Sequence, residues 1–177
     1  MEESSVPEVS TRSAGVRYGL ILAGVAIVYF LALTFANVDT TEGIGRWGNI
    51  VFYIGAIYLA QKYFMENGDG FMSFGQGMSI TFWAGLVCSA IYSAFFYVYL
   101  KFIDVSFVET IKQKQIEKMQ EQGMSDEQID QAMSIASNFM TPEVMLFFAL
   151  VGGVIFIVIV GLIVTIFTQR RSPEASM

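Results

Sequence analysis

The sequence of 177 residues contains no histidine and a single cysteine. Histidine is the commonest general base, metal ligand and pH switch in proteins, so its absence removes the usual basis for all three functions. Cys88 stands alone in an apolar stretch, and one chain can therefore form neither a disulfide nor a cysteine-based metal site. No catalytic, cofactor-binding or metal-binding residues are predicted, and the protein is predicted not to be an enzyme.

Charge is also scarce, because 15% of the residues are charged where soluble proteins average about 25%. The net charge of −6 argues against nucleic acid as a partner, since nucleic-acid binding needs clustered Lys and Arg. Hydrophobic residues make up 54% of the chain and are gathered into long runs. This composition is typical of an integral membrane protein whose surroundings are lipid.

Four apolar segments are candidates for membrane spans, because about 20 helical residues cross a hydrocarbon core of about 30 Å. They cover residues 18–36, 47–63, 78–100 and 144–168. The first has a secretory signal as its rival interpretation, but it is longer than the core of about 7–15 residues that such signals carry. The second is the shortest, and a re-entrant or interfacial segment is its alternative. Met78–Leu100 is the clearest span, with twenty-three uncharged residues.

A polar segment between the third and fourth spans, residues 104–141, is predicted to form an extramembrane helical hairpin. Gly123 is a typical end for its first helix. Ser125 followed by Gln128 is a capping box that opens its second helix. The local signals therefore predict a turn at residues 122–125.

An apolar stripe at intervals of three and four residues follows in the second hairpin helix and includes Ile129, Met133 and Phe139. These three are candidate partner-binding residues, or they pack within the hairpin. Neither Gly nor Pro occurs from Leu86 to Gln122. The third span is therefore expected either to continue into the hairpin or to stop near Asp104, which could cap a fresh helix.

The predicted fold is all-α: an integral membrane four-helix bundle with an extramembrane helical hairpin between spans three and four. Residues 15–170 form a single membrane domain, flanked by a disordered tail at 1–14 and a short tail at 171–177. Four spans place both termini on one side. The ten Lys and Arg residues divide equally between the two sides, but three on the hairpin side lie in the acidic hairpin, away from the membrane. Both termini are therefore predicted to be cytoplasmic, in a bacterial inner membrane.

Five short motifs occur in order along the chain: Tyr18-Gly19, Gly70 with Ser73-Phe74-Gly75, Ile103-Asp104, Gly123 to Ile129, and Met140-Thr141-Pro142. Together they resemble the domain-of-unknown-function 4199 family, small four-span membrane proteins of Bacteroidetes-type bacteria, over about residues 12–170. The resemblance implies the four-span architecture and supplies no catalytic residues. In that family proline often follows the aspartate after the third span, whereas Val105 stands here, so the break before the hairpin stays open.

Residues 18–36, 47–60, 78–100 and 144–168 contain no Asp, Glu, Lys or Arg. Ion-coupled transporters, proton pumps and intramembrane proteases handle their substrates with such groups at membrane depth. These classes are therefore disfavoured, whereas a passive pathway is not. Hydroxyl groups within the spans can bond back to their own helix and need no functional role.

Small residues recur at a spacing of four in the third span, at Gly85, Ser89 and Ser93. This pattern predicts a close helix-packing face, either within the bundle or between two copies. Tyr53 and Tyr92 lie nearer mid-span than the other tyrosines. Their hydroxyls need hydrogen-bond partners, which makes them candidate pocket residues.

Methionines populate the hairpin and its exit, and their thioethers are potential Cu(I) ligands. Without His or Cys to complete a site, a gap-filling role is favoured. Two functional hypotheses remain. The first is a structural or partner-binding protein of the bacterial envelope that uses the acidic hairpin to bind another envelope protein or a second copy. The alternative is a passive conduit or a bundle that binds lipid or a small molecule.

Overall fold

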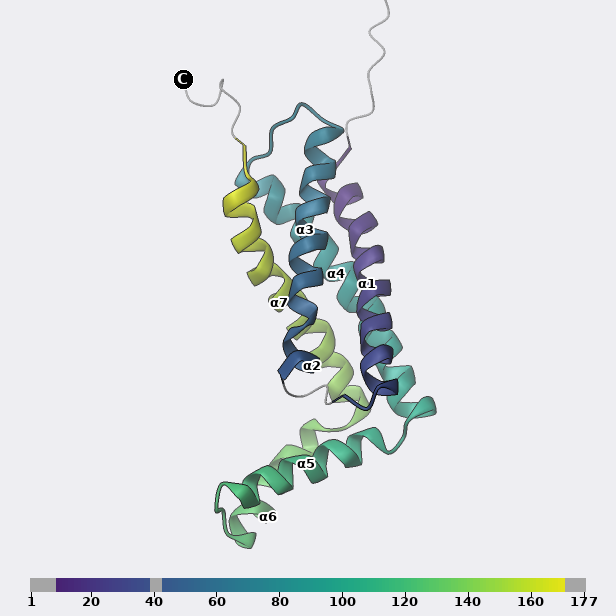
Figure 1. Ribbon diagram of the computed structural model, residues 1–177, viewed down its shortest axis with the longest axis vertical. Helices are drawn as coiled ribbons and strands as arrows, with labels where there is room; N and C mark the ends of the chain where they lie inside the picture. The colour runs from purple at the N-terminus through teal and green to yellow at the C-terminus, as the bar shows by residue number, and fades with distance from the viewer. Residues whose placement is uncertain (1–8, 39–42, 171–177) are drawn as a thin grey trace, which may run out of the picture. The chain divides into compact units, whose positions relative to one another are not determined.

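The computed structural model describes residues 9–38 and 43–170, and in these ranges the secondary structure is helical apart from one isolated β-bridge (Figure 1). The helices are α1 (Thr11–Phe35), α2 (Gly43–Trp47), α3 (Asn49–Glu66), α4 (Phe74–Val98), α5 (Phe107–Glu121), α6 (Asp126–Phe139) and α7 (Pro142–Thr168), with a π-helical turn, η1 (Tyr99–Ile103), after α4. The predicted all-α class is confirmed.

Three helices are long and apolar enough to cross a membrane: α1, α4 extended through η1, and α7. They contain the first, third and fourth predicted spans. The second, α3, is 18 residues long and carries Gln61, Lys62 and Glu66 in its last turns. Its apolar stretch is shorter for that reason. The three apolar helices indicate a multi-pass membrane protein.

The first helix starts well before the apolar run at residue 18. Ser10 caps it, since its hydroxyl accepts a hydrogen bond from the Ser13 amide at 3.1 Å. Ala14 and Gly15 are both buried, so tertiary packing holds the first turns as well. Of the predicted tail at 1–14, residues 1–8 lie outside the described residues, as does the whole of 171–177.

The chain divides into two compact units, here called the first unit (residues 1–92 and 151–177) and the second unit (residues 93–150). In the first unit α1, α3, the first part of α4 and the second part of α7 lie side by side (Figure 1). Helices α1 and α4 begin at the end of this unit where α3 and α7 finish. We call this end the terminal end, because the first residue of α1, Thr11, and the last residue of α7, Thr168, lie there.

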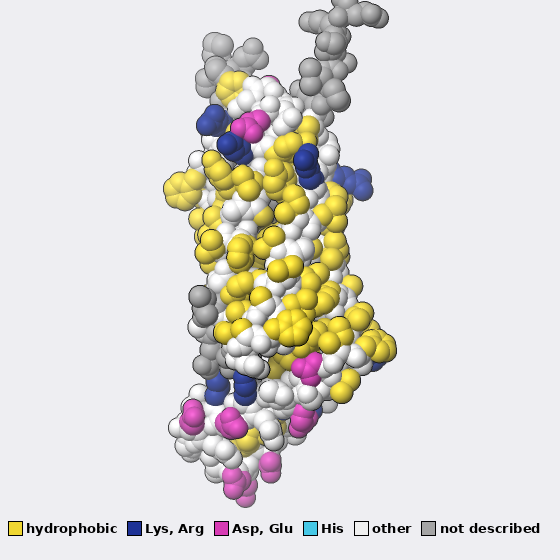
Figure 2. Space-filling view, turned by 45° about the vertical axis from the view of Figure 1, so that its right-hand side comes forward, with side chains coloured by type: hydrophobic (Ala, Val, Ile, Leu, Met, Phe, Trp, Pro, Cys, Tyr) yellow, Lys and Arg dark blue, Asp and Glu magenta, His cyan; other side chains and the backbone are white. Residues whose placement is uncertain are grey.

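The interior of the first unit is apolar and tightly packed. One cluster includes Leu22, Ile57, Cys88 and Ile157, each no more than 3% exposed. The outward faces of the same helices carry large exposed apolar side chains, among them Val28, Val51, Phe82, Ile155, Ile159 and Phe167. On the face that Figure 2 shows, hydrophobic side chains are spread along the length of the bundle. A surface of this kind is stable against lipid and unstable against water.

The second unit contains α5 and α6, which contact each other as a hairpin. The predicted turn is present: Gly123 has a φ of +77°, and Ser125 and Gln128 form both hydrogen bonds of the capping box. Positive φ is inexpensive for glycine alone, which explains why the first hairpin helix ends there.

The path from α4 to α5 is interrupted at residues 104–106, so the third span does not continue into the hairpin as one helix. One carboxylate oxygen of Asp104 accepts hydrogen bonds from the Ser106 amide at 3.2 Å and the Ser106 hydroxyl at 2.7 Å. This side-chain-to-backbone bonding competes with helical hydrogen bonding and ends the helix without proline. Of the two predicted paths, the stop near Asp104 is confirmed. Asp104 does not cap the new helix, because the N-cap of α5 is Ser106.

Candidate functional site

A buried glutamine joins three helices near the terminal end of the first unit. Gln61 on α3 has an exposed fraction of 0%. Its Nε2 donates to the Thr165 hydroxyl on α7 at 2.7 Å, and lies 3.3 Å from the carbonyl oxygen of Gly77 and 3.4 Å from the hydroxyl of Thr81, both on α4. Its Oε1 accepts a hydrogen bond from Thr168. The side chain therefore satisfies its own polar atoms by linking α3 to both neighbours.

Two glycines allow α4 and α7 to approach closely at this cluster. A Cβ on Gly161 would lie 2.6 Å from the hydroxyl oxygen and 2.8 Å from the Cβ of Thr81. A Cβ on Gly77 would lie 2.5 Å from the Cγ2 of Thr165. Both threonines are fully buried. The polar cluster thus exists because glycine on each helix admits a threonine from the other.

Sequence reasoning missed Gln61 and Thr168, since each stands at the polar end of an apolar run. The signal that could have found Gln61 is helical spacing, because it follows the buried Ile57 by four residues. That spacing places Gln61 on the buried face, whereas its neighbour Lys62 is exposed.

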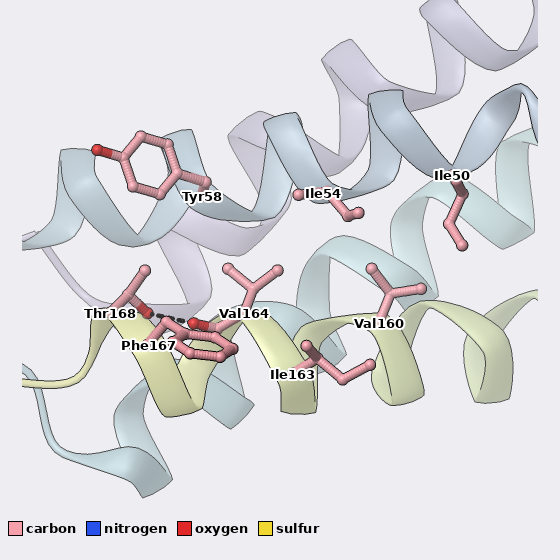
Figure 3. A pocket seen from close by; sticks show the side chains of 8 residues that line it. All are labelled: Ile50, Ile54, Tyr58, Val160, Ile163, Val164, Phe167 and Thr168. Atoms are coloured by element: carbon pink, nitrogen blue, oxygen red, sulfur yellow. Dashed lines mark hydrogen bonds between the residues drawn. The ribbon is translucent and has the colours of Figure 1, made fainter.

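Next to this cluster, α3 and α7 border an open groove of about 360 Å³ (Figure 3). We call the following set the groove: Ile50, Ile54, Tyr58, Val160, Ile163, Val164, Phe167 and Thr168. Its floor is formed by Val160 and Val164, which are 5% and 8% exposed. Its walls include the partly buried Ile50 and four side chains that are 45% exposed or more: Ile54, Tyr58, Ile163 and Phe167. Thr168 closes one end and donates both to the Val164 carbonyl at 3.0 Å and to Gln61.

The groove continues into a charged hollow at the terminal end. This hollow, of about 510 Å³, shares Tyr58, Phe167 and Thr168 with the groove. We call its remaining residues the mouth: Lys62, Met65, Glu66, Gly70, Gln169 and Arg170. The apolar groove therefore ends beside two cationic side chains and one carboxylate.

The backbone at the mouth is held in place by a β-bridge. The amides of Met72 and Arg170 each donate to the other residue's carbonyl at 2.9 Å. The Met72 side chain is fully buried, which fixes the bridge to the bundle. The backbone of Arg170 therefore has a defined position, although its side chain is exposed.

The two tyrosines predicted to line a pocket lie in separate ring pairs. Tyr53 meets Phe156 edge-on at 5.7 Å and lines a hollow of about 380 Å³ beside Trp47 and Asn49. Tyr92 meets Phe30 edge-on at 6.4 Å. The groove takes its tyrosine from Tyr58 instead, one helical turn beyond Ile54.

Two of the predicted packing residues lie against α7 within the first unit. A Cβ on Gly85 would be 3.2 Å from the Cγ2 of Ile157. The hydroxyl of Ser89 would be 2.6 Å from a Cβ on Gly153, so glycine is required opposite it. Ser93 is buried in the second unit. Gly85 and Ser89 therefore serve packing within one chain.

Comparison with known proteins gives one match. The model of the family described as "Protein of unknown function (DUF4199)" matches residues 17–170. The chain belongs to this family. No curated protein and no solved structure matches the chain. Because the family description assigns no activity, the function of this DUF4199 protein has to be argued from its own residues.

The candidate partner-binding residues of the hairpin are not equally accessible. Ile129 is 5% exposed and Met133 is half-buried, whereas Phe139 is 54% exposed with its ring 6.3 Å from that of Phe148. Ile135, four residues before Phe139, is 64% exposed. The stripe therefore has an inner part within the unit and an outer part centred on Ile135 and Phe139.

Proposed function

We propose that this DUF4199 protein is a non-enzymatic membrane bundle that binds an amphiphile, with an alkyl chain lying in the groove. The single observation that carries this proposal is the continuity between an apolar groove with a buried floor and a charged mouth. In a membrane the alkyl chain of the amphiphile gains little hydrophobic free energy by moving from lipid into the groove, because lipid and groove are both apolar. Retention then depends on close van der Waals packing and on the polar contacts at the mouth.

The length and direction of α3 support a four-span topology. Helix α3 has 18 residues, which at about 1.5 Å each gives about 27 Å, close to the thickness of the hydrocarbon core. It also returns the chain from the far end of α1 to the terminal end, where α4 begins (Figure 1). If α1 and α4 cross the membrane, α3 crosses with them.

Cations at the terminal end support cytoplasmic termini in an inner membrane. The guanidinium of Arg12 lies 4.7 Å from the ring of Trp83, and that of Arg17 lies 4.6 Å from the ring of Tyr63. Lys and Arg beside aromatic rings are typical of the membrane interface, and cytoplasmic interfaces are enriched in both cations. Figure 2 shows lysine and arginine side chains at this end, and further ones elsewhere in the view. The mouth would then lie at cytoplasmic headgroup depth.

Filling the groove should release bound lipid. Ile54→Trp places an indole between the walls and excludes about two methylenes together with their van der Waals contacts, each about 0.1–0.2 kcal/mol, so the variant should retain several-fold less lipid. The measurement is native mass spectrometry of lipid retained by the purified full-length protein. Val51→Trp is the matched control, because Val51 is 68% exposed on the same helix and does not line the groove. Equal lipid retention by both variants would rule out the groove as the binding site.

A second candidate function is recognition of an envelope protein, or of a second copy of the chain, by the hairpin. The exposed pair Ile135 and Phe139 favours it, because two large apolar side chains on α6 face solvent in a segment rich in acids. Residues 104–143 hold eight acids and three lysines, so a cationic partner surface fits best.

Replacing Ile135 and Phe139 together with Ser should abolish cross-linking of the hairpin to its partner in native membranes. It should lower the melting temperature only slightly, since Phe139 loses one ring contact, with Phe148, and both side chains are more than half exposed. Ile129→Ser should instead lower the stability of the hairpin, by about 2–4 kcal/mol, because Ile129 is buried. Cross-linking that survives the double change would contradict the partner hypothesis.

A further inference from the structure

The mouth carries a charge pattern that the groove alone does not explain. Among the described charged residues at the terminal end, Arg12, Arg17, Lys62 and Arg170 are cationic, whereas Glu66 and Asp69 are anionic. Lys62 and Arg170 stand at the mouth on different segments, one in α3 and one in the bridge just beyond α7. A positively charged opening at the end of an apolar groove is complementary to an anionic amphiphile.

We infer that the mouth binds the phosphate group of an anionic phospholipid, with Lys62 and Arg170 as its ligands and one acyl chain in the groove. This inference rests on the proposed chain-binding function and adds the class of headgroup. Arginine offers a planar fork that binds two phosphate oxygens at once, and lysine adds a compact point charge. The amide of Gln169, also at the mouth, offers further N–H donors.

The position of Arg170 is fixed before any lipid binds. Its backbone is paired with that of Met72 by two hydrogen bonds of 2.9 Å, and Met72 is fully buried. Only the arginine side chain has to be ordered by the phosphate. Preorganisation of this kind lowers the entropic cost of binding.

The carboxylate of Glu66 competes weakly with the phosphate for Lys62. Its Nζ lies 3.6 Å from a carboxylate oxygen of Glu66, and the two side chains are 49% and 60% exposed. Exposed pairs at this helical spacing contribute little to stability, so Lys62 can exchange the carboxylate for a phosphate. Glu66 itself opposes an anion at the mouth, and its charge should weaken phosphate binding.

A different role for the same cations makes a different prediction. The carboxyl ends of α3 and α7 lie at the mouth, and their partial negative charge favours nearby cations. If Lys62 and Arg170 serve only to stabilise these helix ends, neutral substitutes should lower the melting temperature and leave lipid preference unchanged.

The test compares two lipids that share acyl chains and differ in the phosphate: dioleoyl phosphatidic acid and dioleoylglycerol. Affinities for the full-length protein in mild detergent are measured by native mass spectrometry. The wild-type chain should prefer phosphatidic acid, and Lys62→Gln with Arg170→Gln should weaken its binding by about tenfold or more while leaving dioleoylglycerol unchanged. Glu66→Gln should strengthen phosphatidic acid binding. Lys112→Gln with Lys114→Gln, in the hairpin, is the charge-matched control and should change neither affinity.

Three outcomes overturn the inference. Equal wild-type binding of both lipids shows a chain site without headgroup recognition and leaves the proposed function intact. A phosphatidic acid preference that survives the double neutralisation, with or without a lower melting temperature, removes Lys62 and Arg170 as ligands. Failure of the wild-type chain to bind either lipid removes the proposed function as well.

Discussion

Gln61→Glu should unfold the bundle at neutral pH and leave it folded in acid. The carboxylate would replace an amide that has no exposed surface, and it would lose the Nε2–H donor that reaches Thr165 at 2.7 Å. Burying an ionised carboxylate without a cation costs several kcal/mol. Below a pH of about 4 the carboxyl is protonated, and an un-ionised acid again offers one donor and one acceptor. The melting temperature in detergent, measured against wild type at each pH, tests this.

Gln61→Leu provides the control without a titratable group. It removes the interhelical hydrogen bonds from the amide, each about 0.6 kcal/mol in membrane proteins, so a loss of about 2 kcal/mol is expected at every pH. Thr81 and Thr168 retain bonds to the carbonyls of Gly77 and Val164 on their own helices, which limits the loss. A glutamate variant as stable at neutral pH as in acid would show that water reaches Gln61.

Gly161→Ala should destabilise the bundle although alanine is the better helix former. The added methyl would contact the methyl group of Thr81 and lie 2.6 Å from its hydroxyl oxygen. Thr81 is short, β-branched and bonded to the Gly77 carbonyl at 2.9 Å, so the helices have to separate. Overpacking costs about 1–3 kcal/mol, more than the gain of about 0.5–1 kcal/mol from removing a helical glycine. Thermal unfolding in detergent is the measurement.

Gly152→Ala is the matched control on the same helix, because a Cβ there meets nothing within 4 Å. It should be neutral or slightly stabilising. Adding Thr81→Gly to Gly161→Ala removes the contacting groups and should recover part of the stability. If Gly161→Ala and Gly152→Ala have equal stability, close packing of α4 on α7 does not contribute to the stability of the bundle.

Local signals in the sequence were reliable where neighbouring residues decide the structure. Uncharged length identified α1, α4 and α7, and the Ser125–Gln128 pair identified the start of α6. The helices extend beyond the apolar runs: the first run starts at residue 18, whereas its helix begins at Thr11. A helix continues through polar residues as long as caps and packing support it.

The site was predicted less well than the fold. Tyr53 and Tyr92 were chosen for their depth along the spans. Tyr53 lines a hollow beside Trp47, whereas the tyrosine that lines the groove is Tyr58. Ile129 was grouped with Phe139 by spacing, although one is buried and the other exposed. A stripe of apolar residues gives the direction of a helix face and does not reveal how much of that face a neighbouring helix covers.

The sequence by itself determined the class of protein, because hydrophobic length and scarce charge are summed along the chain and need no partner. The tertiary structure alone decided the Gln61 cluster and the groove. Gln61, Thr81 and Thr165 lie on three different helices, and hydrogen bonds such as the one of 2.7 Å from Gln61 to Thr165 depend on which helix faces meet. The close contact of Gly161 on α7 with Thr81 on α4 determines which faces of these two helices meet, and these residues are 80 positions apart in the sequence. Packing over such separations has no local signature, since each residue is compatible with many neighbours until the helices are assembled.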